Sequence, residues 1–266
     1  MPVEGLRKRA LTAFLVAIPL AAVVFFMPRE YGVVLLTVLA LAGAWEWAGF
    51  FPRVSHFSRF GYLLLISVLM GLSWYFELPV IPVLWVGMVW WLAAFIWILR
   101  FPTPVPNWLI TAGGVLVLVP GWLALSKLHL GWGPHMLTFF FLLVFGADTG
   151  AYFVGKSIGK TRLAPRVSPG KTREGAAGGL LLVAVIGSLG AYYFDLTLIY
   201  LVALCLAVAM ASIVGDLTIS IFKRNAGLKD SGKLFPGHGG VLDRIDSISA
   251  GAPLFLLGLG WFRDIT

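Results

Sequence analysis

Long apolar runs recur along the whole chain, and they constrain its fold more than any other feature. A transmembrane helix needs about 20 largely apolar residues. Runs of this kind lie at about 10–27, 31–51, 60–76, 79–99, 108–125, 137–154, 176–194, 198–219 and 246–262. The sequence therefore predicts an all-α, polytopic integral membrane protein with about nine transmembrane helices.

The composition agrees with a chain that lies in lipid. Only 12% of its 266 residues are charged, whereas a soluble domain has about 25%. So few charges cannot coat a water-exposed surface. The net charge is +8, but no basic stripe with interleaved aromatic residues is present, so we expect no nucleic-acid partner. Cys205, the only cysteine, lies inside an apolar run and is expected to be a buried core residue.

The basic residues predict how the helices are oriented. With nine alternating helices and a cytoplasmic N-terminus, only Arg29, Lys127 and Arg263 of the 20 Lys and Arg fall on the opposite side. The other 17 lie on the cytoplasmic side, as the positive-inside rule requires. Residues 7–9 are basic and precede the first run, as in a signal peptide, but eight further runs favour a retained helix. Short loops and the lack of a transit peptide favour a bacterial inner membrane.

Two long cytoplasmic loops distinguish the C-terminal half of the chain from the N-terminal half. The loops, at about 156–175 and 223–242, are basic and rich in Gly, Pro and Ser, whereas most other connections are short. We therefore expect N-terminal transmembrane helices over residues 1–135 and a catalytic transmembrane half over residues 136–266.

Carboxylates in the apolar runs point to the chemistry. An ionisable residue in a membrane helix is costly, so it is a functional candidate by default. Asp148 and Asp216 lie near the cytoplasmic ends of their runs, and Asp243 and Asp246 lie at the first turn of the last one. At about 1.5 Å per residue, all four reach a similar depth. Such a cluster is suited to a hard divalent cation such as Mg²⁺.

Each carboxylate also has a structural interpretation. Asp243 could cap the last helix, because acidic residues favour a first helical turn. Asp148 or Asp216 could simply pair with a loop lysine. Glu46 lies between two tryptophans, and an interfacial acidic residue is as good an interpretation there as a functional one.

The basic loops indicate that phosphate is bound. Glycine lets backbone amides approach an oxyanion, and Lys or Arg neutralises phosphate charge. Residues 170–172 (Gly-Lys-Thr) are similar to the end of a Walker A motif, but the first glycine of that motif is missing and we expect no preceding strand, so a P-loop is rejected.

A second glycine-rich segment lies close to carboxylates. Residues 236–240 (Pro-Gly-His-Gly-Gly) are followed closely by residues 243–246 (Asp-Arg-Ile-Asp). Carboxylates for a metal, cations for phosphates and a glycine-rich loop together favour phosphoryl or nucleotidyl transfer.

The segment from Ser220 to Asp246 resembles the signature of phosphatidate cytidylyltransferases, also called CDP-diacylglycerol synthases. That signature reads S-x-x-K-R-x₄-K-D-x-G-x₂-F-P-x-H-G-G-x-x-D-R-x-D, and every fixed position is filled here. The segments Ala-Asp-Thr-Gly-Ala-Tyr at 147–152 and Ser-Pro-Gly-Lys-Thr-Arg-Glu-Gly at 168–175 are also similar to that family. The resemblance is specific from about residue 140 onward.

The resemblance implies that CTP and phosphatidate give CDP-diacylglycerol and pyrophosphate at a membrane surface, with Mg²⁺ and room for a second, monovalent cation. It also implies a homodimer. The residues expected to be catalytic are Asp216, Asp243, Asp246, His238 and Arg244; those expected to bind substrate are Lys171, Ser220, Lys223, Arg224, Lys229, Gly239 and Gly240; those expected to bind metal are Asp148, Asp216, Asp243 and Asp246. His238 could instead only stabilise its loop.

Three other functions are compatible with parts of this pattern. An ion-coupled transporter also has intramembrane carboxylates, but these lie near the bilayer midplane. A different membrane enzyme that acts on a polyprenol or lipid phosphate, such as a CTP-dependent lipid kinase, is a second alternative, and only the signature at 220–246 argues against it. A lipid-binding scaffold would not need the constellation from His238 to Asp246.

Overall fold

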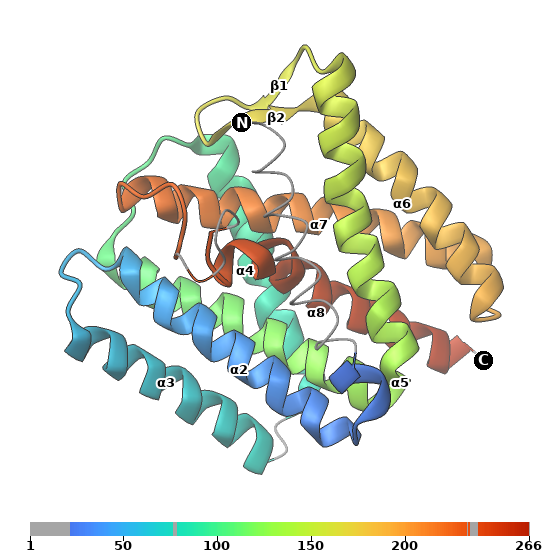
Figure 1. Ribbon diagram of the computed structural model, residues 1–266, viewed down its shortest axis with the longest axis horizontal. Coiled ribbons are helices and arrows are strands. Elements are labelled where there is room, and N and C mark those ends of the chain that lie inside the picture. The colour runs from blue at the N-terminus through green and yellow to red at the C-terminus, as the bar shows by residue number, and fades with distance from the viewer. Residues whose placement is uncertain (1–21, 77–78, 233, 235–238, 266) are drawn as a thin grey trace.

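The protein is built almost entirely of helices, as the apolar runs predict. The structure, a computed structural model, describes residues 22–265 apart from 77–78, 233 and 235–238. Its helices are α2 (Arg29–Trp47), η1 (Ala48–Phe50), α3 (His56–Tyr75), α4 (Val80–Arg100), α5 (Asn107–Ile158), α6 (Arg173–Tyr193), α7 (Leu198–Asn225) and α8 (Leu242–Ile265) (Figure 1). The first apolar run, 10–27, lies largely outside the described residues.

Helix α5 contains two of the predicted spans, 108–125 and 137–154, separated by a sharp break. At the break Gly133 has φ 86° and ψ −179°, a conformation that glycine adopts readily. Pro134 follows, and a proline disfavours helical backbone at the residue before it. The two halves of α5 therefore run in different directions, as Figure 1 shows.

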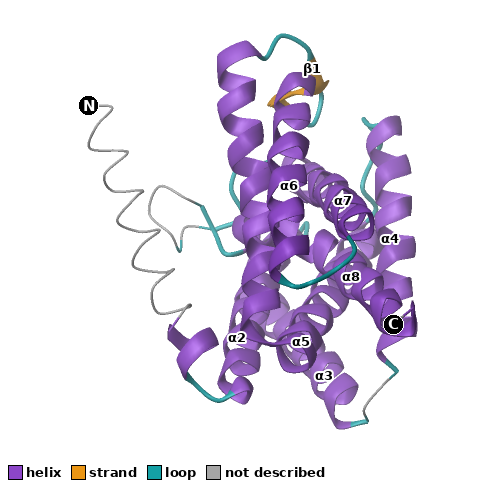
Figure 2. Ribbon diagram, turned by 90° about the vertical axis from the view of Figure 1, so that its right-hand side faces the viewer, coloured by secondary structure: helices purple, strands orange, loops and turns teal. Residues whose placement is uncertain are grey.

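By length and composition, six of the described helices could cross a membrane, and α5 is counted once among them. Helix α8 is not one of the six, although its position matches the predicted span 246–262. It lies among α4, α5 and α7 (Figure 2), with Ile248, Phe255 and Leu259 buried. A helix surrounded by protein needs little lipid-facing surface, so it can carry Asp, Ser and Pro. The count of nine spans remains a prediction.

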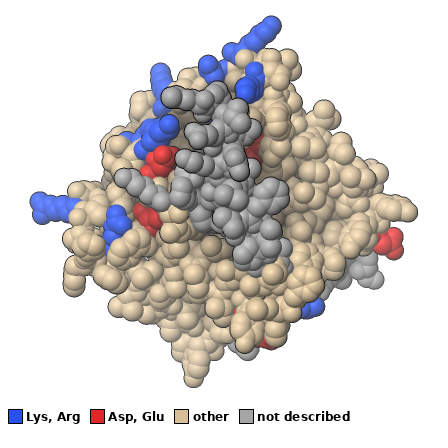
Figure 3. All heavy atoms as spheres, viewed as in Figure 1, with Lys and Arg blue, Asp and Glu red and all other residues tan. Residues whose placement is uncertain are grey.

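Contacts between distant loops agree with the predicted alternation of the helices. On one side, Arg166 Nη1 donates to Phe101 O over 3.4 Å. On the other side, Arg29 Nη1 donates to Leu130 O over 2.6 Å. Figure 3 shows Lys and Arg gathered along the upper and left rim of the molecule, while the face below is nearly free of them. These contacts pair loops that the alternation places on the same side.

The first basic loop folds into a β-hairpin that the sequence did not predict. Strand β1 (Arg162–Ala164) pairs antiparallel with β2 (Ser168–Thr172), so the expectation that no strand adjoins residues 170–172 is wrong. These short strands carry no apolar alternation that would reveal them. The hairpin is fixed to α6, because Glu174 accepts the N–H groups of Lys160 and Thr161 over 3.1 Å. The strand-loop-helix order of a P-loop is still missing, since Lys171 lies within β2 itself.

Candidate active site

A cavity of about 570 Å³ opens where the β-hairpin meets α5, α6, α7 and α8. Its walls carry both signs of charge. The acidic residues on them are Asp148, Asp216, Asp243 and Asp246, and the basic residues are Lys156, Arg162, Lys171 and Arg244. The four aspartates that the sequence places at a similar depth thus line one cavity. Lys171 and Arg244, both predicted site residues, line the same space.

Close helix packing brings the aspartates together. A Cβ atom on Gly179 of α6 would lie 2.6 Å from Ala147 O, so only glycine lets α6 approach α5 so closely beside Asp148. At Gly215 of α7, a Cβ atom would overlap the backbone oxygen of Asp246. Asp216 therefore lies beside α8, and it interacts electrostatically with both Asp148 and Asp246.

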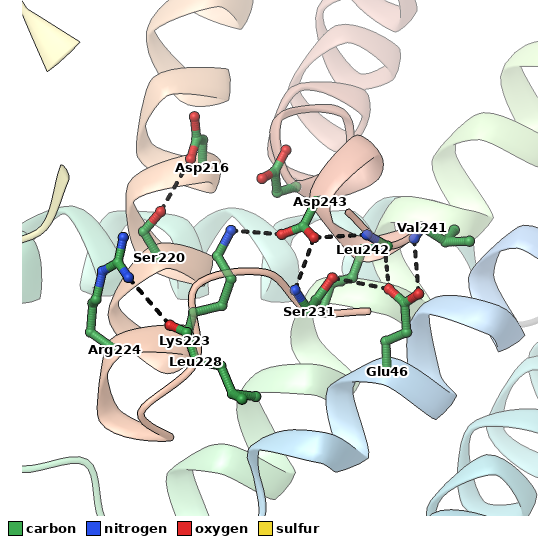
Figure 4. Close-up of polar contacts among 12 residues, drawn as sticks. Glu46, Asp216, Ser220, Lys223, Arg224, Leu228, Ser231, Val241, Leu242 and Asp243 are labelled. Atoms are coloured by element: carbon green, nitrogen blue, oxygen red, sulfur yellow. Dashed lines mark hydrogen bonds and ion pairs between the residues drawn. The ribbon is translucent and has the colours of Figure 1, made fainter. Parts of the chain in front are cut away.

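The aspartate of α7 has a lysine from the hairpin as its partner. Lys171 Nζ lies 2.5 Å from Asp216 Oδ2, and about a quarter of each side chain is exposed. Ser220 Oγ donates to Asp216 Oδ1 over 3.3 Å (Figure 4), so these two residues share a helix face as their spacing predicts. The sequence left open that Asp216 pairs with a loop lysine instead of serving the chemistry, and the structure contains such a pair.

Asp243 lies in a more enclosed environment. Its Oδ1 accepts from Lys223 Nζ over 2.7 Å, and its Oδ2 accepts from the N–H groups of Ser231 and Gly240 over 2.9 Å (Figure 4). Asp243 precedes the predicted span 246–262. Burial opposes ionisation of the carboxyl, but the hydrogen bonds from Gly240 and Lys223 outweigh it and lower its pKa. Both oxygens are therefore engaged by the protein.

The other predicted residues that the structure describes are not among the residues that line the cavity. Lys223 is buried behind Asp243, and Gly240 is buried at the start of α8. Gly239 adopts a positive φ of 81°, as a turn glycine does. Arg224 and Lys229 are exposed, and Arg224 Nη1 donates to Leu228 O over 3.3 Å. His238 lies outside the described residues.

Sequence reasoning missed several side chains that the structure brings to the site. Tyr152, Lys156 and Arg162 line the cavity. Lys156 and Arg162 belong to the basic loop, but charge alone could not single them out among its six Lys and Arg. Glu46, left undecided between two interpretations, is 8% exposed and accepts two backbone N–H groups at the start of α8.

The aspartate side chains on the cavity walls are of the type that binds a divalent cation. Asp148, Asp216 and Asp246 supply the carboxylate oxygens that hard cations prefer, and they face the same cavity. Within the described parts of the chain, no three His, Cys, Asp or Glu side chains converge closely enough to hold a metal ion. Asp216 instead forms an ion pair with Lys171. Lysine and a metal would therefore compete for the same carboxylate.

A model of the cytidylyltransferase family matches residues 7–262. The chain belongs to this family. Proteins named phosphatidate cytidylyltransferase are similar to it over nearly its whole length. The one from Pseudomonas aeruginosa is 40% identical over 269 residues, covering 96% of this chain and 98% of the relative.

Two further relatives carry the same name. The Haemophilus influenzae protein is 36% identical over 280 residues, covering 94% of this chain and 97% of the relative. A Staphylococcus aureus protein is 43% identical over 124 residues, which is 46% of this chain. The family resemblance drawn from residues 220–246 is thus confirmed, and the family's similarity extends into the N-terminal helices, where the sequence had shown only hydrophobicity.

Proposed function

We propose that this membrane protein transfers the cytidylyl group of CTP to phosphatidate, giving CDP-diacylglycerol and pyrophosphate for phospholipid synthesis. The observation that carries the proposal is one cavity with aspartates and cations on its walls, at the ends of apolar helices. A lipid phosphate reaches such a rim from the bilayer, and a nucleotide reaches it from water. The names of the full-length relatives support the same reaction.

The reaction needs little acid–base help from the protein. A phosphate oxygen of phosphatidate forms a bond to the α-phosphorus of CTP, and the bond from that phosphorus to the pyrophosphate oxygen breaks. The attacking phosphate is largely ionised near pH 7, as phosphate monoesters are. The cavity then has to hold two anions in line and neutralise them. We expect Lys171 and Arg244 to do so, and Lys156 and Arg162 line the same cavity.

We propose that the reaction depends on Mg²⁺ held by Asp148, Asp216 and Asp246, with Asp243 as a further candidate. When bound, the ion would neutralise charge on the triphosphate. With Asp216 engaged in holding the ion, Lys171 would be available to bind a substrate phosphate. A second, monovalent cation has only the resemblance in its favour.

We propose that the enzyme lies in the bacterial inner membrane, with its N-terminus and its site on the cytoplasmic side. The distribution of Lys and Arg supports a cytoplasmic N-terminus and a cytoplasmic site, and the bacterial relatives support the inner membrane. A homodimer has only the family resemblance in its favour. Light scattering of the detergent-solubilised protein would measure the oligomeric state directly.

The proposed reaction is tested with CTP labelled at either the α- or the γ-phosphate, together with phosphatidate and Mg²⁺. Cytidylyl transfer moves only the α-label into lipid, whereas a lipid kinase would move only the γ-label. Asp246→Asn should lower the rate by about 10²–10³-fold, the range seen when one electrostatic stabiliser is removed.

Asp195→Asn is the matched control, because Asp195 is exposed in the turn between α6 and α7. Asn also tolerates the positive φ of 54° found there. This variant should behave like the wild type. The proposal fails if folded wild-type protein leaves the α-label in the aqueous phase, and the role of Asp246 fails if its variant retains the full rate.

A further inference from the structure

A carboxylate from the N-terminal part of the chain lies at the start of α8. Glu46, near the end of α2, is 8% exposed. Its Oε1 accepts the N–H of Val241 over 3.0 Å, and its Oε2 accepts the N–H of Leu242 over 2.8 Å. Ser231 Oγ donates to the same Oε2 over 3.0 Å (Figure 4). A residue 195 positions away in the sequence thus binds the first backbone amides of α8.

These contacts are specific for a carboxylate. The first N–H groups of a helix have no partners within the helix, and the positive end of the helix dipole lies there. A buried carboxylate is costly unless hydrogen bonds satisfy it, and here three donors do so. The fit is tight, because a Cβ atom on Gly232 or on Gly240 would overlap the Glu46 carboxylate. An acid that merely reaches toward the interface would not be enclosed in this way.

A second carboxylate binds the same segment. Asp243 Oδ2 accepts the N–H groups of Ser231 and Gly240, and Lys223 Nζ binds Oδ1. Ser231 is therefore bonded to both carboxylates, through its hydroxyl to Glu46 and through its amide to Asp243. Together Glu46 and Asp243 fix the entry of the chain into α8.

The first turn of α8 is also part of the cavity wall. Asp243, Arg244, Asp246 and Ser247 all line the cavity. A shift of the helix start would move these side chains relative to Asp216 and Lys171 on the neighbouring elements. Misplacement by about 1 Å can cost about 100-fold in rate, so a fixed helix start matters for a site of this kind.

We propose that Glu46 is a positioning residue of the active site, which sets the position of α8 and thereby of Asp246 and Arg244. The inference rests on the proposed function and gives one of the N-terminal helices a role in it. Glu46 itself contacts only backbone amides and a serine hydroxyl, so its effect on substrate and metal is exerted through α8.

The test compares Glu46→Gln with Glu30→Gln in the full chain in detergent. The Gln side chain keeps the shape of Glu, but its NH₂ group would face an N–H donor of Val241 or Leu242. Glu30 is the matched control, because it is exposed at the other end of α2. Two quantities are measured: the Mg²⁺ concentration that gives half of the thermal stabilisation with CTP present, and kcat at a temperature where both variants are folded.

For Glu46→Gln we expect the Mg²⁺ midpoint to rise about tenfold and kcat to fall about tenfold or more, as is typical when an outer partner of a metal site is lost. Glu30→Gln should match the wild type in both. A Glu46→Gln variant that melts earlier but keeps both values would reduce Glu46 to a stabilising residue and overturn the inference.

Two further outcomes are informative. If the wild type transfers no cytidylyl group, the proposed function fails, while the Mg²⁺ midpoint still tests Glu46. A wild type with neither activity nor Mg²⁺-dependent stabilisation would overturn both. If Glu46→Gln does not fold, Ser231→Ala replaces it, because that change removes one bond to Glu46. A raised midpoint in Ser231→Ala then supports the inference, and an unchanged midpoint overturns it.

Discussion

Two lysine–aspartate pairs lie at the same site, and they differ in how far the protein encloses them. In the pair between β2 and α7, the side chains of Lys171 and Asp216 are 26% and 25% exposed. In the pair between α7 and α8, those of Lys223 and Asp243 are 10% and 7% exposed. The enclosed Asp243 also accepts two backbone N–H groups. The open Asp216 accepts one serine hydroxyl besides its lysine.

The difference in exposure distinguishes an ion pair that stabilises the fold from one that can take part in the reaction. A buried pair is hard to open, because either charge left alone in a poorly solvated place is very unfavourable. A pair facing a cavity can exchange partners at little cost, because water or a ligand replaces the lost contact. We therefore infer that Lys223–Asp243 holds α7 against α8, while Lys171–Asp216 is free to rearrange when substrate and metal enter.

The largest effect is expected at the enclosed pair. Lys223→Met should lower the free energy of unfolding by about 3–5 kcal/mol, because it leaves Asp243 buried without its cation. Chemical denaturation in mixed micelles measures this loss. Adding Asp243→Asn should recover part of it, with a coupling of about 0.5–3 kcal/mol, since the unpaired charge is then gone. A double variant as unstable as the sum of the single ones would show that the two charges do not support each other.

An intermediate effect is expected where α7 touches α8. In Gly215→Ala, the new methyl group would overlap the backbone oxygen of Asp246 and lie 2.8 Å from Ala250 Cβ. Overpacking of this kind costs about 1–3 kcal/mol. Displacement of α7 away from α8 should strain the Lys223–Asp243 pair, because that pair joins these two helices. Activity should fall together with stability.

Gly71→Ala in α3 is the matched control for this change. Nothing lies within 4 Å of a Cβ atom at Gly71, which is exposed within its helix. The substitution should be neutral or add about 0.4–1 kcal/mol of stability. Equal losses in the two glycine variants would mean that the α7–α8 contact is not the cause.

Much of this arrangement could be predicted from the sequence. Hydrophobic runs predict the membrane helices, because their length and composition are local properties. That Asp148, Asp216 and Asp246 line one cavity could also be predicted, since each lies at a countable depth from a helix end. The break in α5 has a local signal too, because residues 131–135 read Gly-Trp-Gly-Pro-His and combine helix-breaking residues.

Other features could not be predicted, because they depend on contacts between distant parts of the chain. The bond of Glu46 to the start of α8 joins residues 195 apart, and no pattern near Glu46 reveals it. The choice of Lys171 as partner of Asp216 depends on the β-hairpin, whose strands are too short and polar to be recognised. Membership of α8 in the core, rather than at the lipid surface, depends on its neighbours as well.

The smallest effect on stability is expected at the open pair. Lys171→Met should change the free energy of unfolding by less than about 1 kcal/mol, the range of partly exposed ion pairs. Loss of the competing cation should free Asp216 for metal, so the Mg²⁺ midpoint of thermal stabilisation should fall about two- to fivefold. Cytidylyl transfer should nevertheless decline, because the phosphates lose a cation.

Lys160→Met provides the comparison within the same loop, because Lys160 is exposed and its contact to Glu174 runs through the backbone N–H. It should leave both the Mg²⁺ midpoint and the activity unchanged. Tighter Mg²⁺ binding with lower activity in Lys171→Met alone would mean that one lysine serves the site in two places, at Asp216 before substrate binds and at a phosphate afterwards. If Lys171→Met is instead as unstable as Lys223→Met, both pairs are structural and the distinction between them is lost.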